Sequence, residues 1–283
     1  MIMADLSLPL VMGVLNVTPD SFSDGGQWLQ PDRALDHART LVAEGAGIID
    51  VGGESTRPGS IRVDVATELD RVLPVVERLV AEGIEVSVDT MNAETAVRVA
   101  QLGVRYINDV SGGLADPDML AAVANTDAVY ICSHWRGLLA DADAAATYHD
   151  VTEEVLAELS ARLDAARSAG IPDERLISDP GLGFSKRTDH NWQLLANLDR
   201  FVGLGLPVLV GASRKRFISE TVPQALRTGP TADATLANQA RDAATAVVAA
   251  MLFDRGIWGW RVHNAAATSA ALAVAHELRR RGA

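Results

Sequence analysis

The chain has 283 residues, of which 48% are hydrophobic and 22% charged, a composition typical of a globular protein rather than a disordered or fibrous one. Its formal net charge of −12 argues against binding to nucleic acid or to an anionic membrane. The single cysteine, Cys132, excludes an internal disulfide and a four-cysteine metal site. Residues 1–10 lack a signal pattern and no stretch approaches the ~20 apolar residues of a membrane span, so we expect a cytoplasmic protein.

Short apolar runs of strand length alternate with segments of helical spacing along the whole chain. Each predicted strand is followed by a predicted helix, which gives eight consecutive strand–helix units. The predicted strands are residues 10–17, 47–52, 85–89, 106–110, 129–133, 176–179, 207–211 and 257–262. The predicted helices are residues 31–44, 67–82, 93–102, 117–124, 151–169, 191–200, 234–255 and 265–280.

Continuous apolar strands such as Val208-Leu209-Val210 indicate burial on both faces, as parallel strands under helical crossovers require. Eight such units predict an α/β fold, a (β/α)₈ TIM barrel that occupies residues 1–283 as a single domain. An open doubly wound sheet is the alternative, but no G-x-G-x-x-G follows the first strand. The connections at residues 138–149 and 221–233 are long for barrel loops, although neither is typical of a domain linker.

Polar residues follow every predicted strand, at the end of a barrel where active sites form. The groups at the eight strand ends are Asn16 with Asp20 and Asp24, then residues 54–58, Asp89-Thr90, Asn108-Asp109, His134-Trp135, Asp179-Pro180-Gly181, Ser213-Arg214-Lys215, and residues 261–264. Because the carboxyl ends of parallel strands share one edge, we expect these side chains to surround one site.

Several of these strings resemble the signatures of dihydropteroate synthases. Residues 16–26 read Asn-Val-Thr-Pro-Asp-Ser-Phe-Ser-Asp-Gly-Gly, and residues 52–59 read Gly-Gly-Glu-Ser-Thr-Arg-Pro-Gly. Ser-Val-Asp-Thr at 87–90, Asn-Asp-Val-Ser-Gly-Gly at 108–113, Asp-Pro-Gly-Leu-Gly-Phe at 179–184 and Gly-Ala-Ser-Arg-Lys at 211–215 follow in the family's order. The first two strings are long and unusual in composition, whereas Ser-Val-Asp-Thr alone means little.

The resemblance implies a transferase of folate biosynthesis from a sulfonamide target family. Such an enzyme condenses a (7,8-dihydropterin-6-yl)methyl diphosphate with 4-aminobenzoate, and it releases 7,8-dihydropteroate and pyrophosphate. The resemblance also implies small-molecule substrates, Mg²⁺ as cofactor and a homodimer.

Asp89, Asn108 and Asp179 come from three separate strands, and converging carboxylate and amide groups can hold the flat ring of a pterin. Each alone could equally cap the following helix. Lys215 and Lys186 are the only two lysines in the sequence. By resemblance Lys215 contacts both pterin and 4-aminobenzoate, whereas a solvated surface position is expected for Lys186.

Arg261 and His263 alternate on the last strand, point the same way and could clamp a diphosphate. A structural salt bridge and a core hydrogen bond are the alternatives for these two residues. By resemblance Asn16 is the protein ligand of the Mg²⁺ that bridges the diphosphate, and Thr56 also binds that group. Asn16 could instead form a turn before Thr18-Pro19.

The glycine- and proline-containing connections after the first two strands are expected to complete the site. The resemblance assigns catalytic roles to Asp24, Arg57 and Lys215. It assigns 4-aminobenzoate binding to Phe22, Thr56, Arg57, Pro58, Ser213 and Arg214. On residue type alone, Arg57 and Arg214 could be ordinary surface arginines.

The chain presents no Ser-His-Asp set, catalytic cysteine or paired carboxylate, which favours catalysis by positioning and electrostatics over a covalent intermediate. Two alternatives remain open at this point. One is a pterin-binding paralogue that has lost transfer activity, and the other is a pterin-barrel methyltransferase that acts on a methylated folate.

Overall fold

The computed structural model describes residues 8–18, 30–54, 62–137, 145–228 and 234–282. Its eight parallel strands run in the order β6-β5-β4-β3-β2-β1-β8-β7. The strands are β1 Leu10–Asn16, β2 Ile48–Gly52, β3 Val86–Asp89, β4 Tyr106–Asp109, β5 Val129–Ser133, β6 Leu176–Asp179, β7 Leu209–Val210 and β8 Gly259–Val262. The predicted TIM barrel is therefore confirmed.

The barrel closes between β6 and β7 through much less pairing than elsewhere. β7 has two residues, and an isolated bridge between Ser178 and Val208 connects it to β6. The Ser178 amide donates a 2.9 Å hydrogen bond to the Pro207 carbonyl beside this bridge. The other neighbouring strands pair through continuous registers, so the β6–β7 junction is the narrowest seam of the described wall.

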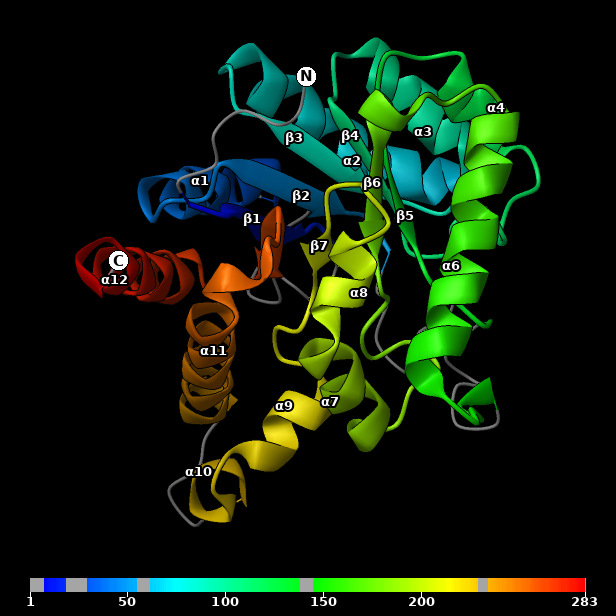
Figure 1. Ribbon diagram of the computed structural model, residues 1–283. Helices are drawn as coiled ribbons and strands as arrows, with labels where there is room; N and C mark the ends of the chain where they lie inside the picture. Colours follow the sequence, from blue (N-terminus) through cyan, green and yellow to red (C-terminus); the bar gives the residue numbers. More distant parts are fainter. Residues whose placement is uncertain (1–7, 19–29, 55–61, 138–144, 229–233, 283) are drawn as a thin grey trace.

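Helices surround the sheet on its outer side (Figure 1). They are α1 Gln30–Ala43, α2 Val65–Ala81, α3 Ala93–Gln101, α4 Met119–Ala124, α6 Val151–Ser168, α7 Thr188–Ala196, α8 Leu198–Val202, α9 Arg216–Thr221, α10 Gln224–Thr228, α11 Ala234–Met251 and α12 Ala265–Gly282. The described residues also contain two short 3₁₀ turns, Asp173–Arg175 and Phe253–Arg255.

Three sequence-based element predictions need correction. The expected helix at 191–200 begins earlier and is two helices, because Asn197 leaves the helical conformation between α7 and α8. The expected connection at 221–233 contains α10 within its described part. The expected helix at 234–255 ends at Met251 and continues as a 3₁₀ turn up to Gly256, which adopts a left-handed conformation (φ 72°).

Two separate apolar clusters follow from the two-residue period of the strands. The larger cluster lies between the outer face of the sheet and the helices, and Tyr130, Val88 and Trp260 belong to it. The smaller one fills the barrel interior toward the amino ends of the strands with Met12, Ile48, Tyr106, Val129, Ile131, Ile177, Leu209 and Trp258. This second cluster acts as a floor beneath the carboxyl ends.

None of the helices in the described part of the chain combines the length and the apolar character needed to cross a membrane.

Candidate active site

Charged side chains, rather than apolar ones, occupy the barrel interior above the apolar floor. The Nε of Arg261 donates to Asp50 Oδ2 at 2.6 Å, and its Nη2 donates to Asp89 Oδ2 at 2.8 Å. Asn108 Nδ2 donates to the same oxygen of Asp50 at 3.2 Å. Arg261 and Asp50 thus connect Asp89 and Asn108, two residues predicted to bind the pterin, through one buried network.

The electrostatics of this network reflect burial. Loss of hydration raises the pKa of Asp89 above its usual range, and the nearby Asp50 carboxylate adds to this effect although Arg261 opposes it. Burial lowers the pKa of Arg261, but the charges of Asp50 and Asp89 more than offset this and raise it. The arginine therefore stays a cation.

We call the opening of the barrel at the carboxyl ends of the strands the mouth. Asp179 and Lys215 face each other on the other side of this mouth. Asp179 Oδ1 accepts a 2.7 Å hydrogen bond from the Gly181 amide. The Lys215 ammonium donates to the Leu182 carbonyl and lies 4.6 Å above the centre of the Phe184 ring. Burial lowers the pKa of Lys215 to about 8 and raises the pKa of Asp179, while each charge counteracts the shift of the other.

Gly211 leaves space between these two charges. A Cβ atom at this position would lie 3.7 Å from Lys215 Nζ and 4.0 Å from Asp179 Oδ2, within ordinary van der Waals contact. A side chain there would project into the interior next to both groups. The glycine therefore keeps the centre of the mouth open to a flat ligand.

Ser213 and His263 form a separate pair at the rim. Ser213 Oγ lies 3.0 Å from His263 Nδ1 and accepts a 3.2 Å hydrogen bond from the His263 amide. Arg261, two residues earlier, contacts Asp50 and Asp89 instead. Asn16 ends β1 beside Gly52, where a Cβ atom would lie 3.4 Å from Asn16 Oδ1.

Arg214 points away from this mouth. Its backbone is left-handed (φ 58°), and its guanidinium makes a two-point contact with Asp242 of α11 at 2.8 and 2.7 Å. Asp242 is buried. Arg214 is therefore not the ordinary surface arginine that residue type alone allowed, since it pairs with a buried carboxylate. Its role in 4-aminobenzoate binding stays a prediction.

Five predicted site residues lie outside the described residues: Phe22, Asp24, Thr56, Arg57 and Pro58. The residues that flank the second of these connections are described. Arg62 Nη2 donates to Asn92 Oδ1 at 2.9 Å, and Asn92 Nδ2 donates to the buried Glu68 at 2.7 Å. Arg62 also pairs with Glu54 at 3.7 Å. Both ends of the connection are therefore anchored to the same side of the barrel.

Sequence reasoning missed two residues of the site. Asp50 sits inside the run Ile-Ile-Asp-Val-Gly, and a carboxylate in a buried strand, two residues before the strand end, was the available signal. Phe184 belongs to the quoted Asp-Pro-Gly-Leu-Gly-Phe string, but its ring contact with Lys215 could not be predicted from spacing.

The surface position expected for Lys186 is wrong. The residue is 5% exposed, and its ammonium contacts His134 Nδ1 at 2.8 Å, the Gly181 carbonyl at 2.9 Å and the Phe184 carbonyl at 3.0 Å. These three acceptors come from the segments after β5 and β6, and they compensate the ammonium for the hydration that it loses on burial. Lys186 therefore belongs to the support of the mouth.

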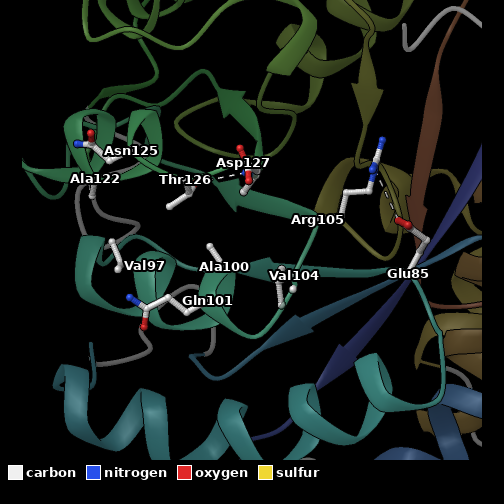
Figure 2. A pocket seen from close by; sticks show the side chains of 12 residues that line it. Glu85, Val97, Ala100, Gln101, Val104, Arg105, Ala122, Asn125, Thr126 and Asp127 are labelled. Atoms are coloured by element: carbon white, nitrogen blue, oxygen red, sulfur yellow. Dashed lines mark hydrogen bonds and ion pairs between the residues drawn. The ribbon is translucent and has the colours of Figure 1, made fainter.

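A pocket of about 480 Å³ lies at the opposite, amino end of the barrel (Figure 2). Its lining includes Glu85 and Arg105, directly before strands β3 and β4, and Asp127, two residues before β5. Glu85 and Arg105 approach each other to 3.9 Å. None of the predicted site residues lines this pocket, so the carboxyl end remains the candidate site.

Comparisons with known proteins identify the family to which this chain is similar. The family model described as "Pterin binding enzyme" matches residues 12–263. A dihydropteroate synthase of Mycobacterium leprae is 48% identical over 265 residues, which cover 93% of this chain and 91% of that protein.

Solved structures give the same result. The Xanthomonas albilineans dihydropteroate synthase with 4-aminobenzoic acid is 42% identical, with a TM-score of 0.86 over 97% of this chain and 94% of that one. The same enzyme in complex with 7,8-dihydropteroate has a TM-score of 0.84 at 40% identity, over 98% of this chain and 95% of that chain.

Proposed function

This chain belongs to the dihydropteroate synthases of the pterin-binding family, and we propose that it joins the methyl carbon of a dihydropterin-methyl diphosphate to the amine of 4-aminobenzoate. The observation that carries the proposal is the set of buried Asp89, Asn108 and Asp179 with the half-buried Lys215 above an apolar floor. Related structures contain 4-aminobenzoic acid and 7,8-dihydropteroate, the second substrate and the product of this reaction.

The ring-binding part of the proposal rests on complementary hydrogen bonding. A pterin carries N–H donors on one edge and a carbonyl and ring nitrogens on another. Carboxylates of Asp89 and Asp179 can accept from the donors, and the Asn108 amide and the Lys215 ammonium can donate to the acceptors. Arg261 holds Asp89 and Asp50 in place, so these groups are oriented before the ligand arrives.

We assign stabilisation of the leaving diphosphate to Ser213 and His263 at the edge of the mouth. His263, directly after β8, forms a hydrogen-bonding pair with Ser213, and Arg261 contributes positive charge from β8. As the bond from the methyl carbon to the diphosphate oxygen breaks, negative charge grows on that oxygen, and these donors can stabilise it. Thr56, by resemblance, would add a further donor.

Mg²⁺ is compatible with the residues present. No cluster of three or more His, Cys, Asp or Glu side chains suited to a metal occurs among the described residues. Asn16 offers one amide oxygen at the end of β1, which fits an ion that keeps water and takes its other ligands from the substrate diphosphate. When bound, Mg²⁺ would neutralise part of the diphosphate charge.

The reaction needs no covalent bond to the protein. The amine nitrogen forms a bond to the methyl carbon, the carbon–oxygen bond to diphosphate breaks, and the amine gives up one proton to the released pyrophosphate or to water. The electron-rich dihydropterin ring can stabilise positive charge on the methyl carbon. The protein contributes position, exclusion of water and fixed charge. Asp24, Arg57 and Phe22 remain residues assigned by resemblance.

The direct test supplies the purified chain with Mg²⁺, the dihydropterin-methyl diphosphate and 4-aminobenzoate. We expect pyrophosphate and 7,8-dihydropteroate in equal amounts, and none without 4-aminobenzoate. Intact pterin binding without product above a no-enzyme control would favour the inactive paralogue. Methyl transfer from a methylated folate to a corrinoid protein, with no pyrophosphate, would favour the methyltransferase.

A homodimer is proposed for the assembled protein. The helices α11 and α12 pack against each other (Figure 1). They expose Val247, Met251, Val274 and Leu278, of which Met251 is 79% exposed. A second copy of this chain could cover these side chains. Sedimentation equilibrium should then give twice the chain mass of 30.0 kDa, and Met251→Arg should lower it to one chain mass.

A further inference from the structure

Lys186 is buried and has no role in the reaction proposed above. It nevertheless contacts the same short segment as Lys215, which has such a role. Lys186 follows the strand-end segment of residues 179–184 and directs its ammonium back into it. The same segment provides the Leu182 carbonyl and the Phe184 ring to Lys215. The two lysines of the chain therefore hold alternate parts of one short segment.

The three acceptors of Lys186 match the three donors of an ammonium group. Two are the carbonyl oxygens of Gly181 and Phe184, at 2.9 and 3.0 Å. The third is the ring nitrogen Nδ1 of His134, at 2.8 Å. A buried cation whose donors are all paired can keep surrounding carbonyls in one orientation.

The state of His134 fits this geometry. Its Nε2 lies 2.9 Å from Glu158 Oε2, and hydrogen bonds from His134 and Arg136 lower the pKa of Glu158 to about 2. Burial and the Lys186 charge lower the pKa of His134 to about 4, so the ring is neutral near pH 7. The single ring proton therefore faces the ionised Glu158, and Nδ1 is left to accept from Lys186.

The backbone of the segment leaves it little freedom to adapt. Gly181 is left-handed (φ 67°), and a Cβ atom there would lie 2.0 Å from the His134 carbonyl oxygen. Gly183 is also left-handed (φ 79°), and the Lys215 side chain fills the position that its Cβ would take. The Tyr148 hydroxyl donates to the Ser185 carbonyl at 3.1 Å from the outer side.

We propose that Lys186 is a positioning residue, which through the carbonyls of Gly181 and Phe184 shapes the cradle of Lys215 and so sets where that ammonium meets the substrates. Lys186 is itself held in place by His134, which in turn contacts Glu158. The effect on transfer rests on the function proposed above, whereas the effect on Lys215 can be measured without catalysis.

A second consequence concerns the protonation of Lys215. Burial and the charge of Lys215 lower the pKa of Lys186 well below its usual range. Burial lowers the pKa of Lys215 to about 8, and the charged groups that act on it are Asp179 on β6, Arg261 on β8 and Asp89 on β3. Because Lys186 is not among them, a change in the Lys215 midpoint in a Lys186 variant reports a change in the Leu182 and Phe184 contacts of Lys215.

The presence of only two lysines makes this directly observable. In protein labelled with ¹³C at the lysine ε carbon, Lys186→Met should remove one of two signals and so assign the other to Lys215. We expect the Lys215 titration midpoint to fall by about one pH unit in this variant, because a displaced Leu182 carbonyl no longer favours the charged form of Lys215.

Kinetics provide the second readout. In Lys186→Met the KM for 4-aminobenzoate should rise about tenfold, because each 1.4 kcal/mol of lost binding corresponds to a factor of ten. The alkaline limb of kcat/KM should move to lower pH together with the Lys215 midpoint. Arg187→Met is the matched control, since it removes an exposed cation one residue later; it should change neither quantity.

Two variants of His134 cover the case in which Lys186→Met does not fold. His134→Asn keeps an acceptor near Nδ1, whereas His134→Leu removes it. We expect the asparagine variant to stay near the wild-type Lys215 midpoint and the leucine variant to shift it. A folded Lys186→Met protein with a lower melting temperature but an unchanged midpoint and KM would overturn the proposal, and so would identical midpoints in the two His134 variants.

Discussion

The two ends of the barrel interior are built from the same strands but by opposite chemistry. On β6, Ile177 belongs to the apolar floor and Asp179 to the charged mouth two residues later. On β2, Ile48 and Asp50 repeat this arrangement, and on β4 Tyr106 and Asn108 do so again. Because successive inward positions differ by two residues, one short strand serves both ends.

The apolar floor stabilises the folded barrel, whereas the burial of charged groups in the mouth lowers its stability. Burial of apolar side chains in the floor stabilises the fold, at roughly 1.5 to 3 kcal/mol for each fully buried large side chain. The mouth instead keeps Asp50, Asp89, Asp179, Lys215 and Arg261 out of water, where their hydration is lost. Mutual pairing offsets that loss, and the ligand is expected to complete it.

Breaking the pairing in the mouth should have the largest effect on stability. Arg261→Met leaves Asp50 and Asp89 as two adjacent buried carboxylates, and loss of one partner of a buried pair costs about 3 to 5 kcal/mol. Without Arg261 the pKa of Asp89 rises further, so the folded variant binds a proton that the unfolded chain releases. The stability of the variant should therefore fall as pH rises from 5 to 8.

Urea unfolding of Arg261→Met at these two pH values measures the effect, and Asp50→Asn in addition should recover part of the loss. A loss below about 1 kcal/mol that is the same at both pH values would show that the mouth does not depend on this pairing.

Matched substitutions on β6 should separate the two ends more finely. Ile177→Ala opens a cavity in the floor and should lower the free energy of unfolding by about 2 to 5 kcal/mol, with kcat nearly unchanged while the protein is folded. Asp179→Asn keeps an oxygen for the Gly181 amide and should change that free energy by less than about 1 kcal/mol.

The binding of a diphosphate-free pterin should show the reverse pattern. Asp179→Asn should weaken it roughly 10- to 150-fold, equivalent to about 1.5 to 3 kcal/mol for a lost hydrogen bond to a charged group. Calorimetry on both variants tests this. Equal losses of pterin affinity in Ile177→Ala and Asp179→Asn would mean that the two layers do not act separately.

The smallest change to the fold is expected from Gly211→Ala. The added methyl group would lie at ordinary contact distances, 3.7 Å or more from Lys215, Arg261 and Asp179, so the unfolding free energy should stay within about 0.5 kcal/mol. The methyl would nevertheless occupy the opening between Asp179 and Lys215, and pterin binding should weaken at least tenfold.

Gly259→Ala, at the amino end of β8, is the control for this substitution, because its methyl would meet Leu209 and Leu10 of the floor side instead. Pterin affinity should be unaffected there. If the two alanine variants bind pterin equally well, Gly211 does not border the ligand.

The barrel could be predicted because strands and helices leave strong periodic patterns in the sequence. Asp89, Asn108 and Asp179 could be predicted because each lies at or near the end of a strand. In the structure Asp89 and Asn108 share one network, and the charges of Asp179 and Lys215 act on each other. What their side chains bind stays a prediction.

The remaining features depend on contacts that no local pattern contains. Lys186 is buried because His134, 52 residues earlier, accepts from it. Arg214 turns to Asp242 because its backbone is left-handed, a conformation rare for residues with a side chain. Asp50 looked like part of an apolar strand, and its role follows from Arg261, 211 residues away.

The narrow seam between β6 and β7 gives the ligand a mechanical role. Asp179 ends β6, and Lys215 follows β7, so the two groups stand on opposite sides of the junction that the Ser178–Val208 bridge closes. A ligand ring bound by both residues would connect the two sides of the β6–β7 junction. Opening of this seam would require the ligand's contacts to break first. Tighter ligand binding should therefore slow amide hydrogen exchange at the β6–β7 junction.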